Sequence, residues 1–220
     1  MRPEPTGGVP DSTSFAQALS TLKEEGSNIL VVGTDAGRAQ AASCERLLGG
    51  NEEPTRYRLR VLTGSDDPDG AATLLEGDRD RVVRFDMDLR DRTSTSPEGG
   101  LGSSSLGAFG GAVIETINAM HHEAGSFEPG EFRVCVHTLD QLLGSHDDQA
   151  VFRLVHMLGS RIRQLDGMGH FHLSAPRDDD HVQVMEPLFD AIVEVRIQEG
   201  SPEQRWELRG GAHRSEWLAI

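Results

Sequence analysis

The first candidate binding site in the sequence is a short turn. It follows an apolar run over residues 28–32 and precedes a helical pattern over residues 36–48. In parallel α/β sheets, ligands bind beyond the carboxyl ends of the strands, above all at a first turn of this kind. A phosphate-binding loop has the form G-x-x-x-x-G-K-S/T: the glycines let backbone N–H groups wrap the phosphates, the lysine holds the β- and γ-phosphates, and the hydroxyl binds magnesium. The candidate nucleotide-binding positions here are Gly33, Thr34, Asp35, Gly37 and Arg38.

The turn departs from that form at each position that would grip a triphosphate. Counted from the first glycine, the motif requires glycine, lysine and a hydroxyl where the chain has Arg38, Ala39 and Gln40. With a loop one residue shorter, Arg38 replaces the lysine. The planar guanidinium of arginine substitutes poorly for the compact ammonium group of lysine, and Ala39 still lacks the hydroxyl. Asp35 also places negative charge where a phosphate would sit.

We therefore expect no ATP hydrolysis, no catalytic residue and no bound cofactor, because phosphoryl transfer depends on the positioning of the phosphates and of the metal. The alternative is a weak nucleotide-binding switch, or a residual ATPase, that holds ATP and magnesium through the turn from Gly33 to Arg38.

A second group of polar residues follows the apolar strand predicted over residues 132–136. In P-loop enzymes the residue just after this strand is an acid that holds magnesium through water, whereas this chain has His137. Asp140 lies one turn further on and would approach the same space, although a turn-capping role is the favoured interpretation.

Histidines and cysteines raise the question of a metal. His170 and His172 project to the same face of one predicted strand, and His137 would lie beside them at the sheet's end, which allows a metal hypothesis. Because no local ligand motif accompanies them, hydrogen-bonded core or rim positions are favoured and no metal is predicted. Cys44 and Cys135 lie far apart in the sequence, which favours buried thiols in a reducing compartment over a disulfide or a zinc site.

The charge balance narrows the possible partners. The chain of 220 residues carries 36 acidic and 21 basic residues, a formal net charge of −15, and Lys23 is its single lysine. This argues against nucleic acid and against an anionic membrane as partners, since phosphate binding requires clustered basic residues. An acidic, lysine-poor composition suits molar salt and suggests a haloarchaeal source, with an acidic protein from a GC-rich bacterium as the alternative. A signal peptide and a membrane span are not recognisable, so a cytoplasmic location is expected.

The hydrophobic pattern predicts an α/β fold with a mostly parallel twisted sheet, helices on both faces and an antiparallel edge at the C-terminus. We expect a flexible tail over residues 1–11 and a single domain over residues 12–220, divided into an N-terminal helix (12–26), a core (28–200) and a C-terminal edge (201–220). Residues 91–107 are rich in Ser, Gly, Thr and Pro and predict a long loop, either mobile or ligand-binding. Further strands are expected at 57–63, 81–89, 132–136, 170–174 and 191–197, and further helices at 105–123, 147–167 and 180–189.

Six segments in order together resemble haloarchaeal RecA/KaiC-like proteins over about residues 13–197. They are residues 28–48, 101–107, 133–139 with 142–143, 151–158, 170–173 and 188–195. The resemblance implies a RecA-type P-loop core, whose active members place nucleotide at subunit edges. The missing lysine and hydroxyl, and His137 in place of the acid, depart from the family pattern.

A non-catalytic regulatory or protein-interaction domain, binding a partner protein or itself, is therefore the expected function. The apolar face of the N-terminal helix and the loop over residues 91–107 are its candidate contact regions. A nucleic-acid-handling recombinase is the least favoured alternative because of the charge.

Overall fold

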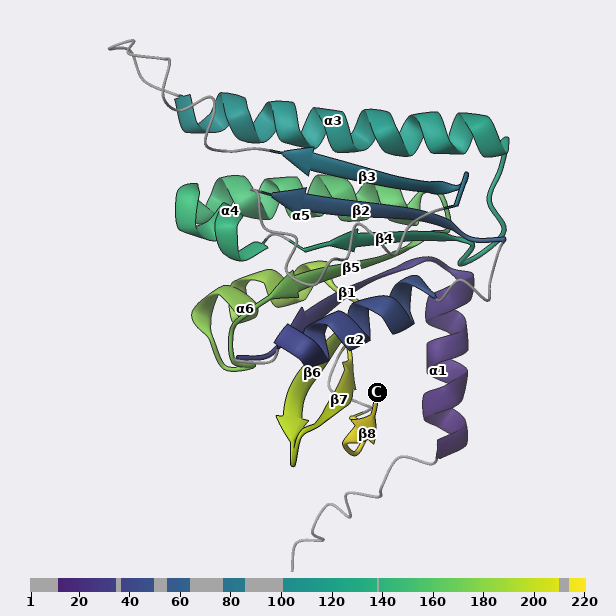
Figure 1. Cartoon of the computed structure of the whole chain (residues 1–220), viewed down its shortest axis with the longest axis vertical. Helices are drawn as coiled ribbons and strands as arrows, with labels where there is room; N and C mark the ends of the chain where they lie inside the picture. The colour runs from purple at the N-terminus through teal and green to yellow at the C-terminus, as the bar shows by residue number, and fades with distance from the viewer. Residues whose placement is uncertain are drawn as a thin grey trace, which may run out of the picture.

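The strands described by the computed structural model form one mixed sheet in the order β3-β2-β4-β5-β1-β6-β7-β8 (Figure 1). The model describes residues 12–34, 37–49, 55–63, 77–85, 101–137, 139–209 and 214–220. The strands from β3 to β6 in this order run parallel, and β7 and β8 are antiparallel, which confirms the α/β class and the antiparallel C-terminal edge. The strands are β1 (Ser27–Val32), β2 (Tyr57–Thr63), β3 (Asp80–Phe85), β4 (Phe132–Val136), β5 (Met168–Leu173), β6 (Ala191–Gln198), β7 (Ser201–Leu208) and β8 (Leu218–Ala219).

Helices cover the sheet on both faces, as the apolar central strands require. The helices are α1 (Ser12–Glu24), α2 (Gly37–Leu48), α3 (Leu101–Ala124), α4 (Leu139–Ser145), α5 (Asp148–Arg163) and α6 (Asp180–Met185). Leu30 and Val32 of β1 join the core formed with α3, α4, α5 and α6, whereas Ile29 and Val31 join a smaller core with α1, α2 and β7. Figure 1 shows α2 crossing in front of the sheet, with α5 behind it. None of the described helices combines the length and the apolar character that a membrane crossing requires.

Helix α5 follows the sequence pattern closely. The side chain of Asp147 accepts a hydrogen bond from the amide of Ala150 and caps the helix, while Val151, Leu158 and Ile162 are buried as predicted. Helix α3 differs from the prediction, because it begins at Leu101 rather than at residue 105. Glycines and serines favour helix poorly, but burial of Leu106 and of the apolar stripe that follows stabilises the whole helix and overrides local propensity.

Two other predicted segments lie partly outside the described residues. Strand β3 covers residues 80–85 at the edge of the sheet, while residues 86–89 of the predicted strand lie outside the described residues. The predicted loop over 91–107 divides in the same way: residues 91–100 lie outside the described residues and 101–107 belong to α3.

The start of β1 is fixed to its neighbours by one carboxylate and one amide. Asp190 Oδ2 accepts hydrogen bonds from the backbone amide of Asn28 at 2.9 Å and from the guanidinium of Arg163 at 2.7 Å. The side-chain amide of Asn28 donates to the carbonyl of Gly159 in α5 at 3.0 Å. A Cβ at Gly159 would lie 2.9 Å from the Asn28 side chain, so glycine permits this close approach of helix and strand.

Replacing Asp190 with alanine should lower the free energy of unfolding by about 1–3 kcal/mol, because the buried Asn28 amide loses its acceptor. Urea unfolding in potassium chloride measures the change. Glu115→Ala on the exposed side of α3 is the control and should change stability by less than about 0.5 kcal/mol. Equal losses in the two variants would show that Asp190 has no special role at this junction.

Candidate functional site

The turn after β1 is closed by a side chain of the helix that follows it. Gly33 is buried, Thr34 is exposed, and Arg38 is exposed in the first turn of α2, whereas Asp35 lies outside the described residues. The side-chain amide of Gln40 donates a hydrogen bond to the carbonyl oxygen of Gly33 at 3.0 Å. Gln40 stands where the phosphate-loop motif requires a magnesium-binding hydroxyl, and its side chain binds the backbone carbonyl of Gly33 instead.

The same glutamine also contacts a histidine of the sheet. Gln40 Oε1 lies 3.3 Å from Nδ1 of His172 on β5, and both side chains are buried. Because an amide oxygen only accepts, Nδ1 of His172 carries the hydrogen in this contact. Its other ring nitrogen, Nε2, has no hydrogen-bond partner within the described part of the chain.

The two residues that follow β4 have different surroundings. His137 is half-buried, and its ring centroid lies 4.5 Å from that of His172. Asp140 is exposed on α4, and its Oδ1 accepts a hydrogen bond at 2.8 Å from the amide of Ser174, just after β5. Asp140 therefore makes a capping contact that joins α4 to the end of β5.

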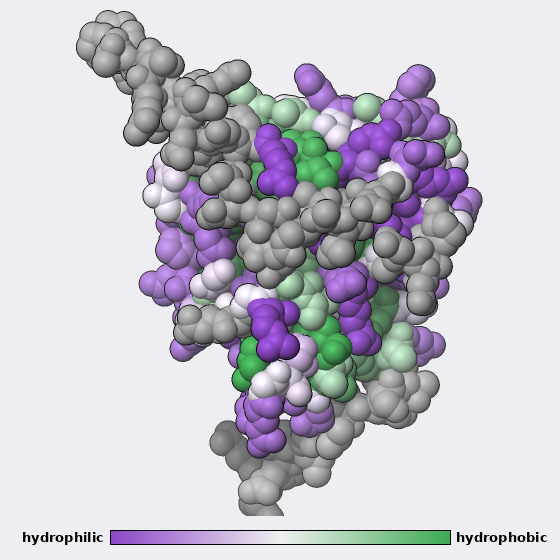
Figure 2. Space-filling model, in the orientation of Figure 1, coloured by the Kyte–Doolittle hydropathy of each residue, from purple (hydrophilic) through white to green (hydrophobic). Residues whose placement is uncertain are grey.

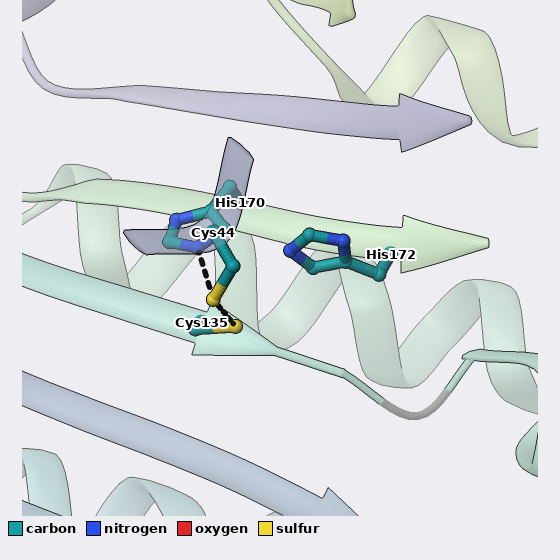
Figure 3. Close-up of side chains that lie close together, drawn as sticks. All are labelled: Cys44, Cys135, His170 and His172. Atoms are coloured by element: carbon teal, nitrogen blue, oxygen red, sulfur yellow. Dashed lines mark hydrogen bonds between the residues drawn. The ribbon is translucent and has the colours of Figure 1, made fainter. Parts of the chain in front are cut away.

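Behind the turn, two cysteines and two histidines converge under α2 (Figure 3). Cys44 comes from α2, Cys135 from β4, and His170 and His172 from β5. The two Sγ atoms lie 2.9 Å apart, and Nε2 of His170 lies 3.4 Å from Sγ of Cys44. None of the four residues is more than 2% exposed, and their potential ligand atoms all lie within 4.8 Å of one another. We call these four residues the Cys/His cluster.

Helix and strand spacing explain why these side chains meet. Gln40 and Cys44 are four residues apart on α2, which places them on one face about 6 Å apart along the axis. His170 and His172 are two residues apart on β5, which places them on one face at about 6.6 Å. The two spacings match, so Gln40 faces His172 and Cys44 faces His170. Cys135 pairs with His170 in the register of β4 and β5, which completes the cluster.

The pKa values of the groups in the Cys/His cluster are shifted in different directions. A hydrogen bond with the Cys135 thiol lowers the pKa of Cys44 well below its ordinary value, and nearby His170 adds to this against the effect of burial. Burial, reinforced by Cys44, raises the pKa of Cys135 well above its ordinary value. Burial also lowers the pKa of His172 to about 4, so its imidazole is neutral at pH 7. The guanidinium of Arg60, 3.5 Å from Cys44 Sγ, is placed to stabilise negative charge on that sulfur.

A family model matches residues 26–195, more than half of the chain, under the description of a family of unknown function, DUF7504. The chain belongs to the DUF7504 family. The matched segment of this DUF7504 chain includes the turn after β1 and all four residues of the Cys/His cluster. No curated protein matches the chain.

Part of this DUF7504 site was accessible from the sequence. The prediction that His137, His170 and His172 gather at one end of the sheet is confirmed, with ring centroids of the latter pair 5.3 Å apart. Both cysteines are buried free thiols, as predicted. Their contact, with the two Sγ atoms 2.9 Å apart where α2 packs over β4, was not predicted. The sequence signal for this contact is the i, i+4 spacing of Gln40 and Cys44, which matches the i, i+2 spacing of His170 and His172 on the facing strand.

Replacing Gln40 with alanine should lower the free energy of unfolding by about 1–3 kcal/mol, because the carbonyl of Gly33 and Nδ1 of His172 both lose a buried partner. Urea unfolding measures the effect, with Gln17→Ala on the exposed side of α1 as the matched control. If the two variants are equally stable, Gln40 does not hold the turn.

Proposed function

We propose that this DUF7504 chain is a non-catalytic RecA/KaiC-like domain, which binds a partner protein or a second copy of itself and does not hydrolyse ATP. The observation that carries the proposal is the contact of the Gln40 side chain with the carbonyl of Gly33. This hydrogen bond ties the first turn of α2 to the end of β1. In an active phosphate loop, the same region presents backbone N–H groups to the phosphates and a hydroxyl to magnesium.

The strand order is compatible with the RecA-type part of the proposal. In open α/β sheets, ligands bind beyond the carboxyl ends of the parallel strands. Here β5 lies between β1 and β4 in the sheet, and β1 is flanked on its other side by β6. The two positions at which the chemistry would be expected therefore lie at the same edge of the sheet, after β1 and after β4.

The side chains at that edge suit a triphosphate and its metal poorly. Magnesium prefers oxygen ligands, whereas the position after β4 holds His137, which packs against His172. Asp140, the nearest acid along the chain, accepts from the amide of Ser174. Arg38 is the cation nearest the turn in sequence, and it extends from an exposed position on α2. A weak nucleotide-binding switch would have to depend on that single arginine.

A surface between α3 and α5 is the best supported place for a protein contact. A hollow there exposes apolar side chains, and Met157 in its wall is 42% exposed. Its lining residues are Leu106, Gly107, Ala150, Arg153, Leu154 and Met157. The apolar face of α1, considered from sequence as a contact region, packs instead against the core around Val193 and Trp206. On the face that carries α1 and α2, hydrophilic residues dominate, with apolar residues visible in small patches (Figure 2).

Addition of ATP and magnesium in molar potassium chloride should leave the melting temperature of the protein unchanged. A ligand at 100 times its Kd would stabilise the fold by about 2.7 kcal/mol, which thermal unfolding detects readily. Calorimetric titration of the wild type and of Arg38→Ala separates the two nucleotide hypotheses. Binding by the wild type that Arg38→Ala abolishes would overturn the proposal in favour of the weak nucleotide switch.

Affinity capture from the organism that makes the protein should recover a partner through the α3–α5 surface. Met157→Asp places a charge in the apolar hollow and should reduce recovery at least tenfold at high salt. Val184→Asp, at an exposed position of α6 outside the hollow, is the matched control and should retain the partner. Identical recovery by the wild type and both variants would exclude this surface as the contact.

A further inference from the structure

The Cys/His cluster has the donor set of a zinc site. Two sulfurs and two imidazole nitrogens from α2, β4 and β5 face one another within 4.8 Å. Structural zinc is held by four such ligands in a tetrahedron, and an S₂N₂ set is typical of zinc among the common metals. The four side chains lie in the interior beneath a helix, whereas surface cysteines and histidines often gather without any ligand.

An independent observation concerns the free nitrogen of His172. Its Nε2 is fully buried without a hydrogen-bond partner among the described residues, although an imidazole nitrogen in the protein interior normally has one. Gln40 holds the hydrogen on Nδ1, so Nε2 carries the lone pair. Metal-binding histidines are commonly oriented in this way, by a partner on the nitrogen that does not bind the metal. Gln40 thus leaves Nε2 of His172 with a lone pair that accepts no hydrogen bond from the residues that the structure describes.

The charges of the four ligands alone balance that of a divalent metal. Two thiolates contribute two negative charges, which one Zn²⁺ offsets, and the two imidazoles are neutral ligands. Arg60 lies 3.5 Å from Cys44 Sγ and adds a hydrogen-bond donor to the sulfur. Without a metal, a thiolate at Cys44 would be stabilised by that arginine, by the Cys135 thiol and by the imidazole of His170.

The distances require a small adjustment. Zinc–sulfur bonds of about 2.3 Å in a tetrahedron place two sulfurs about 3.8 Å apart, so the Cys44 and Cys135 sulfurs, at 2.9 Å, must separate by about 0.9 Å. Figure 3 shows the two sulfurs and the ring of His170 close together, with His172 beside them on the same strand.

We propose that Cys44, Cys135, His170 and His172 bind one zinc ion in a closed structural site that fixes α2 to β4 and β5. The metal displaces the two thiol protons to solvent and forms two Zn–S and two Zn–N bonds, with no change in oxidation state. It occupies the layer between helix and sheet, behind the turn that follows β1. The inference does not rest on the proposed function, because a zinc site in this position is compatible with binding or absence of a nucleotide.

The test begins with the metal content of the whole chain. Protein refolded with zinc chloride under reducing conditions and passed through a desalting column should retain one zinc per chain by mass spectrometry. Cobalt in place of zinc should give the visible absorption of a tetrahedral Co²⁺ complex and a near-ultraviolet thiolate-to-cobalt band. This readout needs only the wild-type protein, so it remains decisive if the variants fail to fold.

Variants then assign the ligands. Cys44→Ser should weaken zinc binding at least tenfold and remove about half of the thiolate-to-cobalt absorption, because Cys135 remains as the second thiolate. Gln40→Leu should weaken binding about 10–100-fold while the cobalt spectrum stays tetrahedral, because its effect reaches the metal through His172. His156→Gln, at an exposed position of α5, is the matched control and should bind as the wild type does.

Three results would overturn the proposal. The first is wild-type protein that retains less than a tenth of one zinc per chain after refolding with the metal. The second is protein purified without reductant that, after denaturation, has no free thiol and no metal, which would identify Cys44 and Cys135 as a disulfide. The third is equal zinc retention by Cys44→Ser and the wild type, which would identify adventitious binding elsewhere on the chain.

Discussion

The contact on which the site depends is the packing of a polar face of α2 against polar positions of the sheet. In most of this protein, helices meet the sheet through aliphatic side chains, as α5 does through Val151, Leu158 and Ile162. Under α2 the interface contains Gln40 and Cys44 opposite His172 and His170, all buried. Buried polar groups must find partners or destabilise the fold, so the hydrogen bonds among these four side chains fix the position of the helix.

This constraint links the turn to the interior. In a nucleotide-binding domain, the helix after the first strand is held partly by the phosphates that its N-terminus binds. In this protein, α2 is held by side-chain contacts with the sheet, because Gln40 binds both the carbonyl of Gly33 and the ring of His172. A zinc ion in the Cys/His cluster would strengthen the same anchor one turn further along α2. The polar residues around the turn after β1 in this α/β domain thus serve internal contacts.

The fold was largely predictable, whereas the site was predictable only in part. Continuous apolar runs such as residues 28–32 identify buried parallel strands without ambiguity, and the stripe of α5 determines its buried face. The start of α3 at Leu101 was missed because its glycines and serines carry no helical signal, and only tertiary burial explains it. The meeting of Cys44 with Cys135 was missed because they are 91 residues apart and the register of β4 and β5 is not encoded in either segment alone. Alternation within β5, in contrast, already placed His170 and His172 on one face.

If Gln40 closes the turn after β1 through its contact with the carbonyl of Gly33, magnesium and ATP should not bind there. Backbone amide spectra of isotopically labelled protein, recorded during a titration with magnesium and ATP in potassium chloride, test this residue by residue. The amide resonances of Gly33, Thr34, Gly37 and Arg38, and the side-chain amide of Gln40, should stay in place up to millimolar nucleotide. Saturable shifts confined to these resonances would show that a nucleotide enters the turn and that Gln40 does not exclude it.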